Sequence, residues 1–329
     1  MTRTTASIPV DLKNPGQVLA CVGFVEATEV LLGSVEAHFD WTGTTVQFVL
    51  TADSDKNPFE VVLDFLATAR VVELTPFGYV EGGASDGDDE GDDDAMIAES
   101  EDERGEGSDD THEDARDTPG RRTTPAFPSG DGLRNALPTQ LVNGARALTV
   151  SHWADGSSRN DFKLYSGNRS ANRIATQMLR GVRAKPKKSQ SVGDLKTRGL
   201  QQLWQEQRAA LLKAPFDVVT PMGGSFNFDP RGAWTAIDAG YSPNTQKDGI
   251  ASSPVVELLA AIGLEHARPD EYETRKVRYA VWGHALPAML ARAALSGADL
   301  KLPTRRFEFE LDLSGKNKVT TFAQEETQR

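Results

Sequence analysis

Residues 35–50 read VEAHFDWTGTTVQFVL, and this stretch predicts a β-hairpin at the centre of the first folded part. Its first half alternates polar and apolar side chains, the period-two pattern of a strand that is buried on one face. The apolar positions are Val35, Ala37, Phe39 and Trp41. Thr42-Gly43 predicts a turn, and the alternation resumes over residues 46–50.

A helix is expected on each side of this hairpin. Asn14-Pro15 has the pattern of a helix cap followed by proline in the first turn, and Gly33 is expected to end that helix. Asn57-Pro58 opens a second helix in the same way. Short β-prone runs at Ser7–Val10 and Val71–Leu74 complete the order β-α-β-β-α-β. This is the ferredoxin-like pattern, and we predict it for residues 1–81.

The first helix and the hairpin should pack against each other. Val22 lies on the apolar side of the expected helix, and Phe39 lies on the strand face that should meet the helices. We therefore predict that both side chains are buried. RNA-recognition modules share this element order but present aromatic side chains on the open face of the sheet. The placement of Phe39 and Trp41 does not support such a stacking surface.

An acidic insert separates the two folded parts. From Glu81 to Thr118 there are 18 Asp and Glu residues against Arg104 and Arg116, a balance of −16, so the chain's net charge of −12 leaves +4 for the remainder. Dense like charge with few apolar residues predicts disorder for residues 82–132. Two interpretations remain open: the insert screens a basic groove in place of nucleic acid, or it is a spacer that keeps the protein soluble.

Residues 133–329 alternate between helical and strand patterns, which predicts α+β structure for the second part and for the chain as a whole. Helices are expected at Asn168–Val182, Gly193–Leu212, Ser253–Ile262 and Leu286–Leu295. Strands are expected at Ala147–Trp153, Phe162–Tyr165, Phe226–Phe228, Ala233–Ile237, Arg275–Val281, Phe307–Leu313 and Lys318–Phe322.

Positive charge is concentrated in the second part. Between Arg159 and Lys213 there are 13 Lys and Arg residues against three acidic ones, a balance of +10. Arg169, Arg173, Arg180 and Arg183 are expected to share one side of a helix, and the following loop adds Lys185, Lys187 and Lys188. Such a ridge and loop predict contact with a phosphate backbone. Tyr165 and Trp204 are candidates for stacking on bases. The candidate nucleic-acid-binding residues are Arg159, Lys163, Tyr165, Arg169, Arg173, Arg180, Arg183, Lys185, Lys187, Lys188, Lys196 and Arg198. The alternative is a solvated helix face balanced by the acidic insert.

Motifs of catalysis are missing from the sequence. There is no P-loop, GxSxG, HExxH or glycine-rich dinucleotide fingerprint, and the five histidines are scattered singly. We assign no catalytic residue, no cofactor and no metal ligand. A single cysteine excludes an internal disulfide. The sequence has no run of about 18 apolar residues, so we expect no membrane span. The first twelve residues have no apolar core of signal-peptide length. We therefore expect a cytoplasmic protein.

Three blocks of the sequence resemble a CRISPR-associated family, the small effector subunit group of subtype I-U, also called I-G (the Csx-fourteen or Csb-three group). The blocks are SIPVDLKNPGQVLACVGFVEATEVL (Ser7–Leu31), SFNFDPRGAWTAIDAGYSPN (Ser225–Asn244) and SSPVVELLAAIGLEHARP (Ser252–Pro269). A fourth stretch, Phe162–Leu179, is similar to a family segment but carries Tyr-Ser-Gly-Asn-Arg where the family usually has Trp-Ala-Gly-Gln-Gln.

The resemblance implies a subunit of the RNA-guided surveillance complex (Cascade) of antiviral defence, with a large-subunit-like role. Its partners would be guide RNA, target DNA or both, together with other subunits of the effector complex. Two alternatives remain open. One is a metal-independent guide-RNA endonuclease that uses His152 or Tyr165 with a nearby lysine. The other is an assembly protein whose basic face binds an acidic protein partner.

Overall fold

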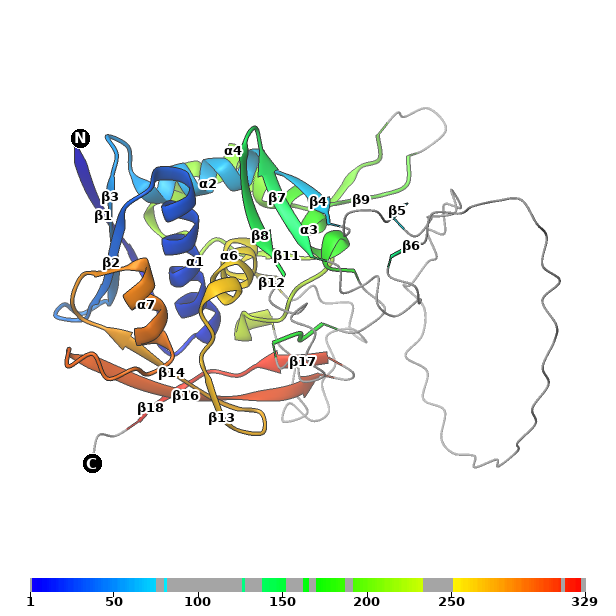
Figure 1. Ribbon diagram of the computed structural model, residues 1–329. Coiled ribbons are helices and arrows are strands. Elements are labelled where there is room, and N and C mark those ends of the chain that lie inside the picture. The colour runs from blue at the N-terminus through cyan, green and yellow to red at the C-terminus, as the bar shows by residue number, and fades with distance from the viewer. Residues whose placement is uncertain are drawn as a thin grey trace, which may run out of the picture. The chain divides into compact units, whose positions relative to one another are not determined.

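The computed structural model describes residues 2–74, 80–81, 126–127, 138–151, 162–165, 170–186, 192–232, 251–314 and 317–326 (Figure 1). Helices and strands both recur along these segments, which confirms the predicted α+β class. Residues 1–74 and 132–329 form one compact unit, where the sequence predicted two folded parts. The second unit, residues 75–131, contributes the parallel pair β5 (Val80–Glu81) and β6 (Ala126–Phe127). The rest of the predicted insert lies outside the described residues.

Two helices that begin alike lie at the centre of the larger unit: α1 (Pro15–Leu32) and α6 (Pro254–His266) (Figure 1). The side chain of Asn14 caps α1 by accepting from the Gln17 amide, and the side chain of Ser253 caps α6 by accepting from the Val256 amide. Proline follows each cap, where its missing N–H costs no helical hydrogen bond. The predicted start at Asn14 and the predicted end at Gly33 are both confirmed for α1.

Glycines let α1 and α6 pack with their backbones in contact. A Cβ atom on Gly23 of α1 would lie 1.9 Å from the Leu259 carbonyl oxygen, and one on Gly263 of α6 would lie 2.4 Å from the Leu19 carbonyl oxygen. No side chain fits at either position without moving the facing helix. Residues 15–28 of α1 are buried on all sides of the helix, and most of them are apolar.

Helix α1 is also the one described element that is long and apolar enough to cross a membrane by length and composition. Most of the helix is buried inside the larger unit instead, against α6 and the sheet that contains the predicted hairpin.

The predicted hairpin is present in a four-stranded antiparallel sheet. Its strands are β2 (Val35–Asp40) and β3 (Gln47–Asp53), and the sheet order is β1-β3-β2-β15, with β1 at Arg3–Pro9 and β15 at Leu286–Pro287. Phe39 lies opposite Phe48, and their rings are 5.0 Å apart. Val22 and Phe39 are both fully buried, so the predicted strand register is confirmed.

The ferredoxin-like arrangement is not found, although the linear order β-α-β-β-α-β is present. The second helix, α2 (Pro58–Thr68), is followed by β4 (Arg70–Glu73), which should lie beside β1. Instead β4 pairs with β7 (Thr139–Asn143), and β7 pairs with β8 (Arg146–Val150). The fourth place in the first sheet is taken by β15, on the opposite edge. A period-two pattern identifies a strand but not its partner, because pairing is a long-range choice.

A second antiparallel sheet closes the unit on the other side of α1 and α6. Its order is β13-β14-β16-β17, and β18 also pairs with β16. The bounds are β13 Asp270–Glu273, β14 Lys276–Trp282, β16 Thr304–Ser314, β17 Asn317–Thr320 and β18 Gln324–Glu325; α7 (Ala288–Leu295) follows β15. The expected strands around Arg275–Val281 and Phe307–Leu313 are confirmed. Trp282 Nε1 donates to the Ala37 carbonyl at 2.7 Å, which joins the two sheets.

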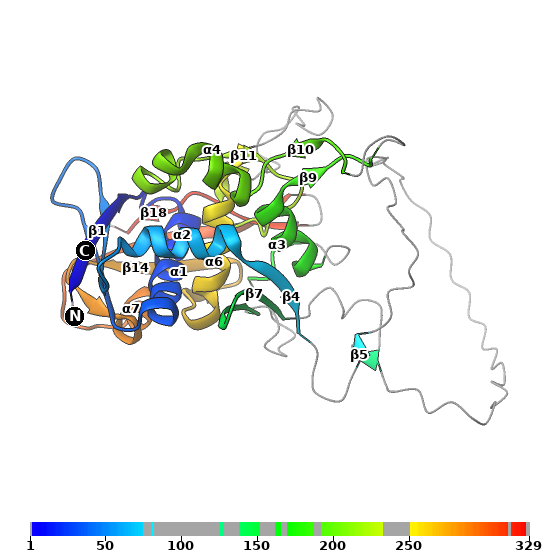
Figure 2. The ribbon, with the colours of Figure 1, turned by 90° about the horizontal axis from the view of Figure 1, so that it is seen from above.

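The segment between β8 and β13 in the sequence carries the basic residues, and here several expected boundaries were wrong. The elements are α3 (Ala171–Arg180), β9 (Val182–Arg183), β10 (Leu195–Thr197) and α4 (Leu200–Lys213), followed by β11 (Thr220–Pro221), the 3-10 helix η2 (Pro230–Gly232) and β12 (Ala251–Ser252). The helix expected from Gly193 begins only at Leu200, and neither Phe162–Tyr165 nor Phe226–Phe228 forms a strand. The strand expected at Ala233–Ile237 lies outside the described residues. Figure 2 shows α4 beside α2, and Arg208 joins them by an ion pair to Glu60 at 2.5 Å.

Candidate nucleic-acid interface

Helix α3 has one buried and one basic side. Its N-cap, Ser170, accepts from the Arg173 amide at 3.2 Å. The buried side chains recur at helical spacing: Ala171, Ile174, Ala175, Met178 and Leu179. Arg173 and Arg180 lie seven residues apart, which places them on one side of the helix, and both are exposed. Arg180 also lies in the last turn, where the helix dipole favours a cation.

A two-stranded ribbon follows α3 directly (Figure 2). Gly181 makes the turn with a positive φ of 72°, and a Cβ atom there would lie 2.2 Å from the Thr197 carbonyl oxygen. Strands β9 and β10 pair antiparallel, with Arg183 opposite Leu195. Arg183 was expected on the helix, but Gly181 ends α3 and puts Arg183 on the ribbon. The Ala184 amide donates to the Asp194 carbonyl at 2.7 Å, which continues the ribbon beyond β9.

Five exposed cations on α3 and the ribbon form what we call the basic face: Arg173, Arg180, Arg183, Lys185 and Lys196. Arg183 Nη1 donates to the Gly193 carbonyl at 3.2 Å, so one end of its guanidinium is engaged. Among the described residues, Arg173, Arg180 and Lys196 make no ion pair. Within the described residues, the basic face thus carries positive charge without an acidic partner at these three positions.

Other candidate residues lie elsewhere or are already engaged. Arg198 is exposed but pairs with Glu206 at 2.7 Å. Arg159, Arg169, Lys187 and Lys188 lie outside the described residues.

The two aromatic candidates are packed into the protein, which corrects the predicted stacking role of Tyr165. Its side chain is 4% exposed and contacts Phe226, and burial raises the pKa of its hydroxyl well above the ordinary value. The ammonium of Lys163 covers the ring at 4.4 Å, and burial lowers the pKa of this lysine. Trp204 is 7% exposed, and the Arg208 guanidinium covers it at 4.4 Å. Large aromatic rings gain most from burial, and the local sequence gave no sign of which face they would take.

A buried polar network lies where α1 and α6 begin, and sequence reasoning missed it. Asp229 accepts from Arg231 Nη2 at 2.7 Å, from Asn14 Nδ2 at 3.1 Å and from the Ser253 amide at 3.2 Å. Glu257 of α6 accepts in turn from the Asp229 amide at 2.8 Å. The network ties the segment before η2 to the caps of both central helices. A glutamate within the apolar run PVVELLAAIGL was the sequence signal that could have predicted it.

The pKa values of the two carboxylates in this network are shifted in opposite directions. Burial alone would raise the pKa of Asp229, but the hydrogen bonds and charge of Arg231 outweigh it and hold the pKa below the ordinary value. Burial raises the pKa of Glu257 to about 7, and the nearby charge of Asp229 adds to the effect. Both carboxylates have donors inside the fold, so this cluster stabilises the meeting of three segments.

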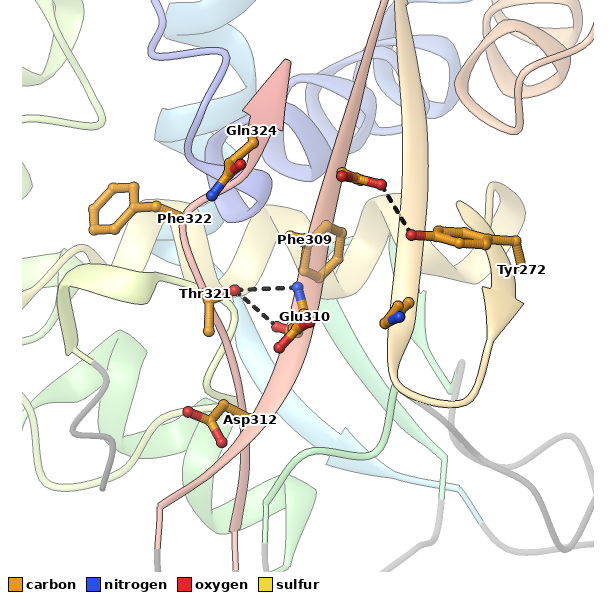
Figure 3. A pocket seen from close by; sticks show the side chains of 9 residues that line it. Tyr272, Phe309, Glu310, Asp312, Thr321, Phe322 and Gln324 are labelled. Atoms are coloured by element: carbon orange, nitrogen blue, oxygen red, sulfur yellow. Dashed lines mark hydrogen bonds between the residues drawn. The ribbon is translucent and has the colours of Figure 1, made fainter. Parts of the chain in front are cut away.

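A shallow hollow of about 550 Å³ lies on the outer side of the second sheet (Figure 3). Its charge is opposite to that of the basic face, because Glu308, Glu310 and Asp312 line it against the single cation Lys276. Tyr272 donates to Glu308 at 2.9 Å, as the dashed line in Figure 3 shows. These acidic side chains are the polar face of strand β16, whose other face is buried.

In the part of the chain that the structure describes, no three His, Cys, Asp or Glu side chains are grouped so that they could hold a metal ion. His152, the histidine weighed for a nuclease, lies outside that part. Comparisons with protein-family models, with curated proteins and with solved structures find nothing that matches this chain.

Proposed function

We propose that this chain contacts a nucleic-acid backbone through the basic face, as a non-catalytic subunit of an RNA-guided CRISPR type I surveillance complex. The observation that carries the proposal is the pair Arg173 and Arg180, exposed on one side of α3 and without an ion pair within the described residues. The CRISPR setting rests on the resemblance of Ser7–Leu31, Ser225–Asn244 and Ser252–Pro269 to that family.

Phosphate is the ligand whose chemistry this arrangement fits. A guanidinium presents parallel N–H donors that match two phosphate oxygens, and a lysine ammonium adds a mobile point charge. Each phosphate that the protein neutralises releases condensed counterions, which favours binding at low salt. Between Arg159 and Lys213 there are 13 Lys and Arg residues against three acidic ones, so the local density of positive charge along the chain is high.

The endonuclease alternative loses one of its two candidate residues. The Tyr165 side chain is 4% exposed, so its hydroxyl is not accessible to a substrate in this structure. The assembly-protein alternative uses the same exposed charges, so binding experiments must separate it from the proposal.

The test measures binding of the full chain to labelled RNA and DNA by fluorescence anisotropy over a range of salt concentrations. The affinity should fall as salt rises, with a log–log slope of roughly one per phosphate contacted, and Arg173→Gln with Arg180→Gln should lower that slope by about two. Lys56→Gln with Arg306→Gln is the matched control, because it removes two exposed positive charges that lie outside the basic face. Binding without salt dependence, or equal slopes for both double variants, would overturn the proposal.

The CRISPR setting has its own test. A tagged chain purified from its native host should bring down RNA that contains CRISPR repeat sequence together with other effector subunits. Recovery of the chain without such RNA would refute the setting and leave the phosphate contact standing.

A further inference from the structure

Close backbone contacts join the elements that carry the basic face, which constrains the form of its ligand. A Cβ atom on Gly199 would lie 2.3 Å from the Gly181 nitrogen, and one on Gly193 would lie 1.6 Å from the Ala184 carbonyl oxygen. The first contact brings the end of α3 against the start of α4, and the second brings the two sides of the ribbon together. Val182 adds a bond from its amide to Thr197 Oγ1 at 3.1 Å. These contacts fix the spacing of the backbone positions that carry the cations, which suits a ligand with regularly spaced phosphates.

The segment that carries the basic face lacks exposed aromatic rings on which the bases of a single strand could stack. Residues 166–203 contain no Phe, Trp or Tyr, and the aromatic residues on either side, Tyr165 and Trp204, are buried. Proteins that bind single strands gain about 1–3 kcal/mol for each base that stacks on an aromatic ring. The basic face offers charge and aliphatic surface in place of rings.

Aliphatic side chains lie on the ribbon and just before its second strand. Val192 is 56% exposed and Leu195 is 37% exposed, and Leu195 lies directly opposite Arg183 across the ribbon. The major groove of B-form DNA is about 12 Å wide and admits a two-stranded ribbon, and apolar side chains there contact thymine methyl groups. The major groove of A-form helices is too narrow to admit side chains in this way.

We infer that the ligand of the basic face is double-stranded DNA, with Arg173 and Arg180 on the phosphate backbone and ribbon β9–β10 in the major groove. This inference rests on the proposed function and narrows its ligand. It assigns phosphate contact to the helix and groove contact to Leu195 and Val192.

The experiment compares four labelled probes of equal length and sequence at one salt concentration: double-stranded DNA, an RNA–DNA hybrid, single-stranded DNA and single-stranded RNA. The full chain should bind the DNA duplex at least about tenfold more tightly than the other three. Equal or tighter binding of a single strand or of the hybrid would overturn the inference, while the salt-dependent binding would still support the proposed function. Absence of binding to all four probes would overturn both.

Variants of the ribbon test the groove contact separately. Val192→Ser with Leu195→Ser should lower the affinity for double-stranded DNA about three- to tenfold and leave the salt slope unchanged, because no charge is removed. Both side chains are exposed, so the fold should not suffer. Val30→Ser with Leu313→Ser, at two exposed apolar positions on other elements, is the matched control and should leave the affinity unchanged. An unchanged affinity of the ribbon variant would overturn the groove contact.

Discussion

The central helices and the helix of the basic face differ in how much of their surface is buried. Helix α1 is buried on all sides, and glycines bring its backbone against α6. Helix α3 buries one side and presents Arg173 and Arg180 on the other. Substitutions at the first site should therefore act on folding, and substitutions at the second should act on binding alone. The difference shows which part of the sequence is constrained by packing and which is available for a ligand.

The largest effect is expected in the core that α1 shares with the hairpin. Phe39 is fully buried and contacts Phe48 and Trp282, with its ring 5.1 Å from that of Trp282. Phe39→Ala should lower the free energy of unfolding by about 3–5 kcal/mol, because it leaves a cavity between packed rings. Chemical denaturation with an unchanged m-value would measure this. A loss below about 1 kcal/mol would show that Phe39 is not the anchor that the structure indicates.

A smaller but still large effect is expected where the two central helices touch. Gly23→Ala places a methyl group 1.9 Å from a backbone oxygen of α6, so the helices must separate. We expect a loss of about 1–3 kcal/mol or more in the free energy of unfolding, as for other overpacked cores. Gly33→Ala is a useful contrast, because nothing lies near that position and its cost comes from a φ of 93°. Equal melting temperatures for wild type and Gly23→Ala would contradict the close crossing.

The buried network predicts a dependence of stability on pH. The pKa of Glu257 is about 7 in the folded state, against an ordinary value of 4.5. Between these two pH values the folded state holds a proton on Glu257 that the unfolded state has released. The contribution of this group to stability therefore falls as pH rises from about 4.5 to about 7. The slope should approach about 1.4 kcal/mol per pH unit. Glu257→Gln should flatten it, as measured by denaturation at several pH values between those limits. An unchanged slope in the variant would show that other groups cause the dependence.

The acidic insert should contribute little to folding. Residues 1–74 and 132–329 form a compact unit without residues 75–131. Replacing residues 82–132 by a short Gly-Ser linker should preserve the cooperative unfolding transition, since loop length changes closure entropy only slowly. Tighter DNA binding by this variant would identify the insert as a competitor for the basic face, and unchanged binding would identify it as a spacer. Loss of the transition would contradict its dispensability.

Elements that depend on neighbouring residues could be predicted from the sequence, whereas contacts between distant segments could not. Asn14-Pro15 and the alternation of residues 35–50 gave the first helix and the hairpin, because capping and strand periodicity depend on near neighbours. The pairing of β4 with β7, across more than sixty residues, has no such local signal. In the candidate site, the spacing of Arg173 and Arg180 predicted their shared exposed side, whereas the burial of Tyr165 depends on Phe226 and was missed.

The central claim is that the basic side of α3 serves a phosphate backbone and not the fold. One measurement addresses it directly: the salt dependence of duplex binding by the wild type and by Arg173→Gln with Arg180→Gln, with the unfolding free energy of both measured alongside. The account predicts a log–log slope that falls by about two and an unfolding free energy that changes by less than about 0.5 kcal/mol. An unchanged slope, or a stability loss large enough to explain weaker binding, would contradict it.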